Sequence, residues 1–262
     1  MKVIVGIGDS WTQGQGGVPY RFFEEWGGRV DRSDNETEPK LLKYELENSW
    51  VNVLTRDYFK DHVPINLGMR GYGNRGAVKN LYHYPLPENI TGGCMVFMLS
   101  SRIRFDIVAP TGYTQYRRRF RTYYPHGGDN KEKPGEENWY RLEYTEYLAK
   151  VETLHNILEA QMIAKLNNLE FYFASAFEFM DDLAALPDEH YNLSKQINWD
   201  RYLTPDTNYY QFLNNLNNTP DRTWGDYSNM PYPDTYITNC VHPTIEGYKA
   251  IAKDLSTKLN LW

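Results

Sequence analysis

Short apolar runs and helix-spaced apolar stripes alternate along the chain, and this alternation predicts the fold. The runs predict strands at residues 3–5, 63–67, 94–99 and 170–176. Apolar residues at helical spacing predict helices at residues 48–59, 77–82, 147–168 and 244–259. Because strands and helices alternate, we expect an α/β fold in which one parallel sheet lies between two layers of helices.

Two long stretches interrupt this alternation, at about residues 106–145 and 180–236. Strands and helices resume after each of them, so we interpret both as loop insertions in a single domain that spans residues 1–262. Loops of this length in a compact domain are usually functional. The chain has 22 tyrosines, and many of them lie in these insertions. Such aromatic side chains either hold long loops together or offer flat surfaces to a ligand such as a sugar.

The composition argues against several classes of function. A net charge of −6 disfavours bulk binding to nucleic acid or to a membrane surface. The apolar runs stay well below the roughly 18 residues that a membrane span needs. Two cysteines predict a reducing compartment, and the apolar stretch at the N-terminus is too short for a secretion signal. We therefore expect a cytoplasmic or virion-associated protein with no membrane partner.

No metal or cofactor is expected from the sequence. The histidines lack metal-ligand spacing, and the N-terminal glycines fail the G-x-G-x-x-G spacing of a dinucleotide site. The run at 116–126 is rich in arginine and includes Arg117 and Arg119. It is a candidate surface for an acidic sugar or another anionic polymer, although a nucleic-acid partner is not favoured. Alternatively, these arginines pair with the surplus acidic residues of the chain.

Two reactive side chains lie near opposite ends of the sequence, each where a loop meets a predicted helix. Ser10 follows the first strand, and His242 precedes the last helix. Ligands of open α/β sheets bind beyond the carboxyl ends of the strands, so both residues could line one crevice. A serine hydroxyl and an imidazole together perform nucleophilic catalysis on acyl groups. We therefore expect Ser10 Oγ within roughly 2.6–3.2 Å of a ring nitrogen of His242.

Three sequence blocks resemble those of the SGNH, or GDSL-like, hydrolase superfamily. They are Gly-Asp-Ser at 8–10, Asn-Leu-Gly-Met-Arg-Gly at 66–71 and Asn-Cys-Val-His-Pro at 239–243. The resemblance implies a three-layer α/β/α fold around a flavodoxin-like parallel sheet. It also implies that Ser10 is the nucleophile, that His242 is the general base, and that the N–H groups of Ser10 and Gly71 bind the oxyanion.

The sequence departs from the family pattern after the third predicted strand. The family has Gly-x-Asn-Asp there, whereas this chain has Ser-Ser-Arg-Ile at 100–103. The asparagine of that block would donate a side-chain hydrogen bond to the oxyanion. Arg102 is a candidate donor in its place, or it is a structural or substrate-binding residue.

The second departure is Asn239, which occupies the position of the triad aspartate. An asparagine can orient an imidazole but cannot stabilise its positive charge, so Asn239 is a catalytic candidate that would orient His242. The missing acid leaves three alternatives. A backbone carbonyl orients His242 in a Ser–His dyad, Asp234 replaces the missing acid, or the site has decayed to a binding role. Cys240 is expected to be buried rather than paired with His242.

These residues favour a serine esterase that acts on an O-acylated carbohydrate or another small acyl ester. Asp9 and Trp11 flank the nucleophile and are candidates for substrate binding, together with Arg117 and Arg119, although Asp9 is also suited to bind the amides of its own turn. The alternative function is a weakly active or inactive module of the same fold, which binds other subunits of a larger assembly such as a virion.

Overall fold

The computed structural model describes residues 1–22, 37–102, 104–108, 120–123, 146–177, 192–220, 222–223, 226, 233–259 and 261. Its strands are β1 (Lys2–Gly8), β2 (His62–Asn66), β3 (Gly92–Leu99), β4 (Phe105–Val108), β5 (Phe120–Tyr123) and β6 (Glu170–Ser175). Its helices include α1 (Ser10–Gln13), α3 (Thr37–Asn48), α4 (Trp50–Asp57), α5 (Asn74–His83), α7 (Glu146–Leu166), α9 (Tyr209–Leu216), α11 (Ile245–Lys258) and the short 3₁₀ helix η2 (Trp199–Arg201).

The main sheet is parallel throughout, with the strand order β2-β1-β3-β6. One row across it consists of Ile65, Val5, Met95 and Phe171. The chain passes from β1 to β2 on one side and then crosses to β3 on the other. This reversal is the topological switch point at which open α/β sheets bind ligands, and Ser10 lies two residues after the end of β1 at that point.

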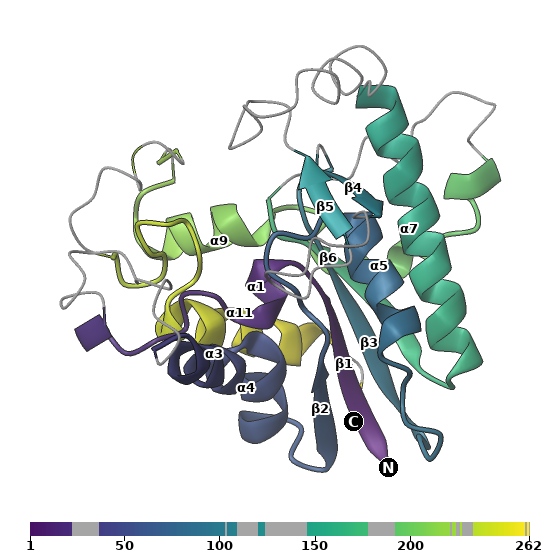
Figure 1. Ribbon diagram of the computed structural model, residues 1–262, viewed down its shortest axis with the longest axis horizontal. Helices are drawn as coiled ribbons and strands as arrows, with labels where there is room; N and C mark the ends of the chain where they lie inside the picture. Colours follow the sequence, from purple (N-terminus) through teal and green to yellow (C-terminus); the bar gives the residue numbers. More distant parts are fainter. Residues whose placement is uncertain are drawn as a thin grey trace.

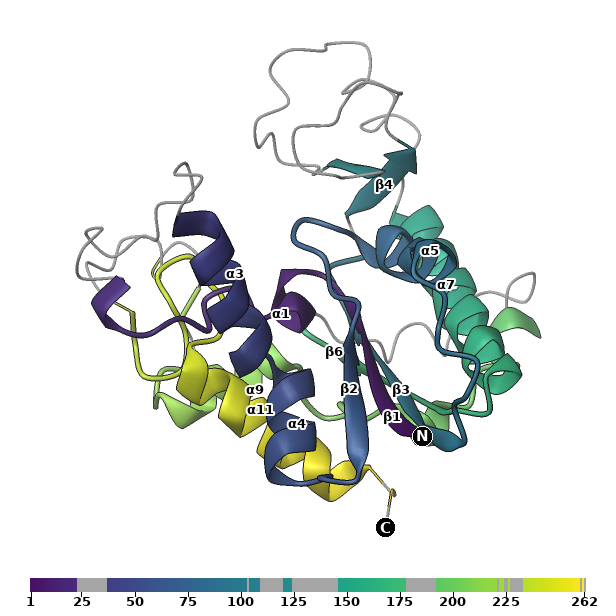
Figure 2. The same ribbon diagram turned by 60° about the horizontal axis from the view of Figure 1, so that its bottom comes forward.

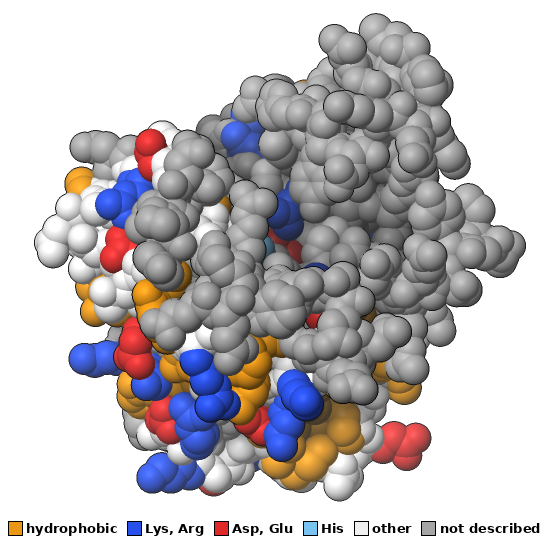
Figure 3. Space-filling view, turned by 60° about the vertical axis from the view of Figure 1, so that its left-hand side comes forward, with side chains coloured by type: hydrophobic (Ala, Val, Ile, Leu, Met, Phe, Trp, Pro, Cys, Tyr) orange, Lys and Arg blue, Asp and Glu red, His pale blue; other side chains and the backbone are white. Residues whose placement is uncertain are grey.

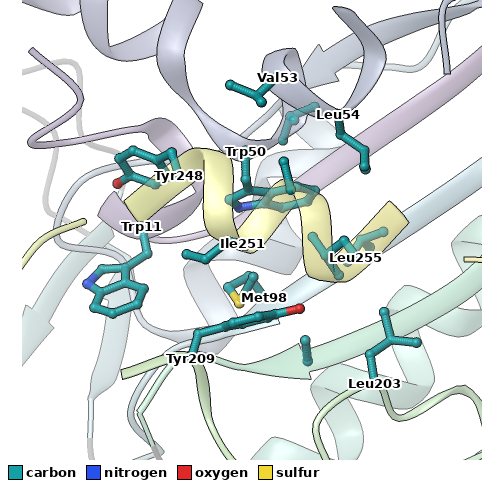
Figure 4. Packing of buried hydrophobic residues seen from close by; sticks show 14 of the residues in the cluster. Trp11, Trp50, Val53, Leu54, Met98, Leu203, Tyr209, Tyr248, Ile251 and Leu255 are labelled. Atoms are coloured by element: carbon teal, nitrogen blue, oxygen red, sulfur yellow. The ribbon is translucent and has the colours of Figure 1, made fainter. Parts of the chain in front are cut away.

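Helices cover both faces of the sheet (Figures 1 and 2). Helices α5 and α7 lie on one face, and α3, α4, α9 and α11 lie on the other. Successive residues of a strand point to opposite faces, so β1 contributes Ile4 to one core and Val5 to the other. Figure 4 shows the first of these cores, in which Trp50 of α4 and Ile251 of α11 lie close to Met98 of β3. The expected three-layer α/β/α arrangement is confirmed.

The structure differs from the sequence-based expectation inside the two insertions. The first contains the antiparallel pair β4–β5, and the second contains η2 and helix α9, where long loops were expected. Helix α9 buries Tyr209 and Leu213 against the core that also contains Trp50. Its apolar stripe is only two turns long and is flanked by asparagines, so the pattern of the sequence did not reveal it. Helix α3 was also not predicted.

Candidate active site

The hydroxyl of Ser10 and the imidazole of His242 meet at the carboxyl end of the sheet. Ser10 is the first residue of α1, and His242 lies in the turn before α11. The distance from His242 Nε2 to Ser10 Oγ is 2.9 Å, although 232 positions separate the two residues in sequence. The proximity expected from the sequence is therefore confirmed. In Figure 3, a histidine lies beside basic and acidic side chains in a hollow of the surface.

A backbone carbonyl fixes the orientation of the imidazole. His242 Nδ1 lies 2.8 Å from the carbonyl oxygen of Cys240. A carbonyl oxygen can only accept a hydrogen bond, so Nδ1 carries a proton, and in the neutral ring Nε2 presents its lone pair to the Ser10 hydroxyl. This is the tautomer that a general base requires.

The two side chains considered as replacements for the triad acid do not orient His242. Asn239 Oδ1 is buried and has no hydrogen-bond partner in the described part of the chain. Asp234 accepts a hydrogen bond from Arg222 Nη1 at 2.6 Å and another from the backbone N–H of Thr235 at 2.8 Å. The geometry therefore corrects the assignment of Asn239 as the imidazole-orienting residue and does not support Asp234. It matches the dyad alternative, in which a carbonyl orients the ring.

A tightly bonded turn holds His242 in place. The N–H of His242 donates to Thr238 Oγ1 at 3.1 Å, and the N–H of Thr238 donates to the carbonyl of His242 at 2.7 Å. Val241, within this turn, has a φ of +60°, which is rare for a β-branched residue. Such strain persists only where surrounding contacts enforce it. Gly16 lies close against this turn, because a Cβ at this position would lie 2.7 Å from the Pro243 carbonyl oxygen and 3.0 Å from His242 Cβ.

Trp11 links the nucleophile to this turn rather than facing a substrate. Its side chain is fully buried, and its indole N–H donates to the carbonyl of Val241 at 3.2 Å. Its ring also packs edge-on against Phe177, with the ring centroids 4.9 Å apart. A fully buried indole offers no face to a ligand, so the expected substrate-binding role of Trp11 is not supported. Figure 4 shows Trp11 near Tyr248 of α11.

The carboxylate of Asp9 is also committed within the protein. It is fully buried and accepts hydrogen bonds from Trp11 N–H (2.9 Å), Ser100 Oγ (2.7 Å) and Arg104 Nη1 (2.6 Å). Asp9 is the N-cap of α1. Of its two expected roles, binding the amides of its turn agrees with the structure, whereas direct substrate binding does not.

The backbone around Ser10 provides candidate oxyanion donors. Within the described residues, the N–H of Ser10 donates to no acceptor. The loop after β2 packs against α1, because the N–H of Met69 donates to the carbonyl of Gly8 (3.1 Å) and the N–H of Arg70 donates to Gln13 Oε1 (2.7 Å). Gly71 follows with a φ of +73°, a conformation that glycine adopts readily. Its role in binding the oxyanion stays a prediction.

The remaining candidate residues are Arg102, Arg117, Arg119 and Cys240. Arg102 lies half-buried in the turn after β3, and its role as a donor also stays a prediction. Arg117 and Arg119 lie outside the described residues. Cys240 is exposed, contrary to expectation, and its Sγ lies 3.1 Å from Thr238 Oγ1 rather than against the imidazole. Among the described residues, no group of three or more His, Cys, Asp and Glu side chains is suited to hold a metal.

The blocks that carry the family resemblance thus follow β1, follow β2 and precede α11. The first and last of them are joined by the Ser10–His242 hydrogen bond at the carboxyl end of a parallel sheet. The chain has a three-layer α/β/α fold, and the sequence blocks that resemble those of SGNH hydrolases lie around the Ser10–His242 contact. In the part of this fold that is described, no helix has the length and apolar character needed to cross a membrane.

The structure of this chain is similar to two solved structures, at low sequence identity. No protein-family model matches the sequence, and no curated protein matches it. A G-D-S-L family protein from Desulfitobacterium hafniense DCB-2 is 15% identical with a TM-score of 0.45, over 99% of this chain and 100% of that one. A carbohydrate acetylesterase family member from Sinorhizobium meliloti is 17% identical with a TM-score of 0.39, over 98% and 96%. The chemistry of the site rests on the geometry of this chain.

Sequence reasoning missed Arg104 and Gln13, which contact the nucleophile turn and the neighbouring loop through side chains. Arg104 lies just before the first insertion, where no pattern indicates which way a side chain points. Gln13 is three residues after Ser10, and that spacing places both on one face of a helical turn. This spacing was the one available signal for a glutamine that supports the site.

Proposed function

We propose that the protein is a serine hydrolase of the esterase type, with Ser10 as nucleophile and His242 as general base. The observation that carries this proposal is the 2.9 Å contact between Ser10 Oγ and His242 Nε2, with Nδ1 held by the Cys240 carbonyl. The proton on Nδ1 leaves Nε2 free to accept the hydroxyl proton, which turns a weak nucleophile into a strong one.

The reaction follows from these contacts. His242 Nε2 takes the Ser10 proton as Oγ forms a bond to the acyl carbon. The tetrahedral intermediate then collapses, the bond to the leaving alcohol breaks, and Nε2 returns the proton to the alcohol oxygen. Water repeats the sequence on the acyl-serine and releases the acid. The N–H groups of Ser10 and Gly71 are the proposed donors to the oxyanion.

A dyad of this kind avoids the largest cost of losing a triad aspartate. In a serine protease, changing that aspartate to asparagine lowers the rate by about 10⁴, because the wrong imidazole tautomer is favoured. The Cys240 carbonyl cannot favour the wrong tautomer, since it has no proton to donate. What is lost is the negative charge that would stabilise the imidazolium, so we expect an active enzyme with a modest rate.

The proposed substrate is an O-acylated carbohydrate or another small acyl ester. The support is compositional: both insertions are rich in tyrosine, which suits sugar rings, and the first is rich in arginine, which suits acidic groups. Hydrolysis of p-nitrophenyl acetate tests the reaction without knowledge of the natural substrate. We expect Ser10→Ala and His242→Ala to lower the rate by at least about 10³. Equal rates in wild type and Ser10→Ala would overturn the proposal and favour a binding or structural module.

A further inference from the structure

Arg104 forms a buried ion pair directly beside the proposed nucleophile. Its Nη1 lies 2.6 Å from Asp9 Oδ2 and 2.8 Å from Ser100 Oγ, which itself donates to the same carboxylate oxygen. Asp9 is fully buried, and the Arg104 side chain is 12% exposed. A buried carboxylate needs such a partner, because an unpaired charge in the interior is strongly destabilising. Arg104 thus secures the residue that immediately precedes Ser10.

The guanidinium also contacts the aromatic residue on the other side of the turn. Arg104 Cζ lies 5.6 Å from the centroid of the Phe177 ring, and Phe177 packs against Trp11. Arg104 therefore contacts Asp9 directly, and it contacts Phe177, which packs against Trp11. Through these contacts it supports both sequence neighbours of Ser10. Strand β4 begins at the residue after Arg104, which ties the first insertion to the same point.

Of the two backbone donors at the start of α1, only the N–H of Trp11 binds the Asp9 carboxylate. The N–H groups of Ser10 and Trp11 have no intrahelical acceptor, as is usual in a first helical turn. Asp9 Oδ1 accepts from Trp11 N–H, while Ser100 and Arg104 hold Oδ2. A carboxylate released from these donors could rotate toward Ser10 N–H and occupy the donor that the oxyanion needs. Its uncompensated charge would also oppose the negative charge that develops there.

We propose that Arg104 is a positioning residue for Ser10. By holding and neutralising the Asp9 carboxylate, it keeps the Ser10 N–H available to the oxyanion. This inference rests on the proposed hydrolase function and deepens it, because it assigns to a residue just before the first insertion a role in the chemical step. Loss of Arg104 should lower kcat and leave KM nearly unchanged, since the oxyanion exists only after the substrate has bound.

The test compares Arg104→Gln, Arg104→Lys and the double variant Asp9→Asn/Arg104→Gln on p-nitrophenyl acetate. We expect Arg104→Gln to lower kcat by about 10²–10³, the usual effect of losing one oxyanion donor. Lysine should restore part of the rate, because it returns the charge. The double variant should also regain activity over Arg104→Gln, because the asparagine side chain is neutral and can still accept from Trp11 N–H. A purely structural role predicts that Arg104→Gln loses stability but keeps the wild-type kcat per folded molecule.

Arg201→Gln is the matched control. Arg201 also forms an ion pair, with Glu170 at 3.0 Å, and lies over the ring of Tyr172, but near the amino end of β6. It should leave kcat within about twofold of wild type, since surface and peripheral changes rarely reach the site. For each variant, kcat is calculated per folded molecule, and the fraction of folded protein is measured by thermal unfolding.

The outcomes separate the inference from the function on which it rests. If wild type shows Ser10-dependent hydrolysis and folded Arg104→Gln has a wild-type kcat, or only a raised KM, the inference is wrong and the hydrolase proposal stands. If wild type shows no Ser10-dependent hydrolysis, both are wrong. A loss of kcat that lysine and the double variant partly reverse supports the inference.

Discussion

Replacing Asn239 by alanine separates the dyad from a triad most sharply. Asn239 lies where the SGNH family has its acid, yet its Oδ1 is buried without a hydrogen-bond partner in the described structure. The Cys240 carbonyl makes the orienting contact instead, at 2.8 Å from His242 Nδ1. Alanine removes the amide and leaves this carbonyl in place. The kcat of Asn239→Ala should therefore stay within about tenfold of wild type, whereas loss of a true orienting residue costs about 10⁴.

The free energy of unfolding should change little in the same variant. Truncation at a buried site costs about 1–2 kcal/mol in lost packing for a side chain of this size. Removing a buried unpaired oxygen returns about 1–3 kcal/mol of desolvation penalty. The two effects oppose each other, so the net change should lie within about 1 kcal/mol of zero.

Asn208→Ala is the matched control for stability. Asn208 is also buried, but its Oδ1 accepts a hydrogen bond from the N–H of Gln211 at 2.8 Å as the N-cap of α9. Its replacement should destabilise the protein by about 1–2 kcal/mol. Denaturant unfolding and ester hydrolysis measure both quantities. A 10⁴-fold loss of kcat in folded Asn239→Ala, without loss of stability, would refute the dyad.

Further predictions concern the turn around His242 and the two thiols. Gly16→Ala should lower kcat by about 10²-fold, because its Cβ would lie 2.7 Å from the Pro243 carbonyl oxygen and 3.0 Å from His242 Cβ and would shift the turn that holds the imidazole. Gly92 also has a positive φ, but a Cβ there meets nothing within 4 Å, so Gly92→Ala should leave kcat unchanged. Equal rates in both variants would contradict this packing. A thiol reagent at neutral pH should modify Cys240 rapidly in the folded protein and Cys94 only after unfolding, since burial raises the pKa of the Cys94 thiol and keeps it protonated. Reaction of both thiols at one rate in the folded protein would contradict the burial of Cys94.

The proximity of Ser10 and His242 could be predicted because it depends on strand order. A residue at the carboxyl end of the first strand and a residue before the last helix share an edge of any parallel sheet of this topology. Apolar runs identified those strands, and the helical stripe at 244–259 identified that helix. Pattern and topology are therefore enough to locate the site.

The finer roles could not be predicted, because they depend on backbone and side-chain directions. The sequence shows Asn239 in the place of an acid, but not that the carbonyl of Cys240 contacts the imidazole. Trp11 resembled a ligand-binding aromatic beside a nucleophile, whereas packing against Phe177 buries it. Arg104 stands in no recognisable motif, and its role follows only from the position of its guanidinium at the Asp9 carboxylate.

The most direct test of the central claim is covalent labelling with a fluorophosphonate probe, followed by mass spectrometry of the modified peptide. Such probes react with serines whose hydroxyl is activated by a neighbouring base. The structure predicts a single label on Ser10 in wild type and little or none in His242→Ala. Absence of label in the folded wild-type protein, or a label on another residue that persists in Ser10→Ala, would contradict an activated serine at this site.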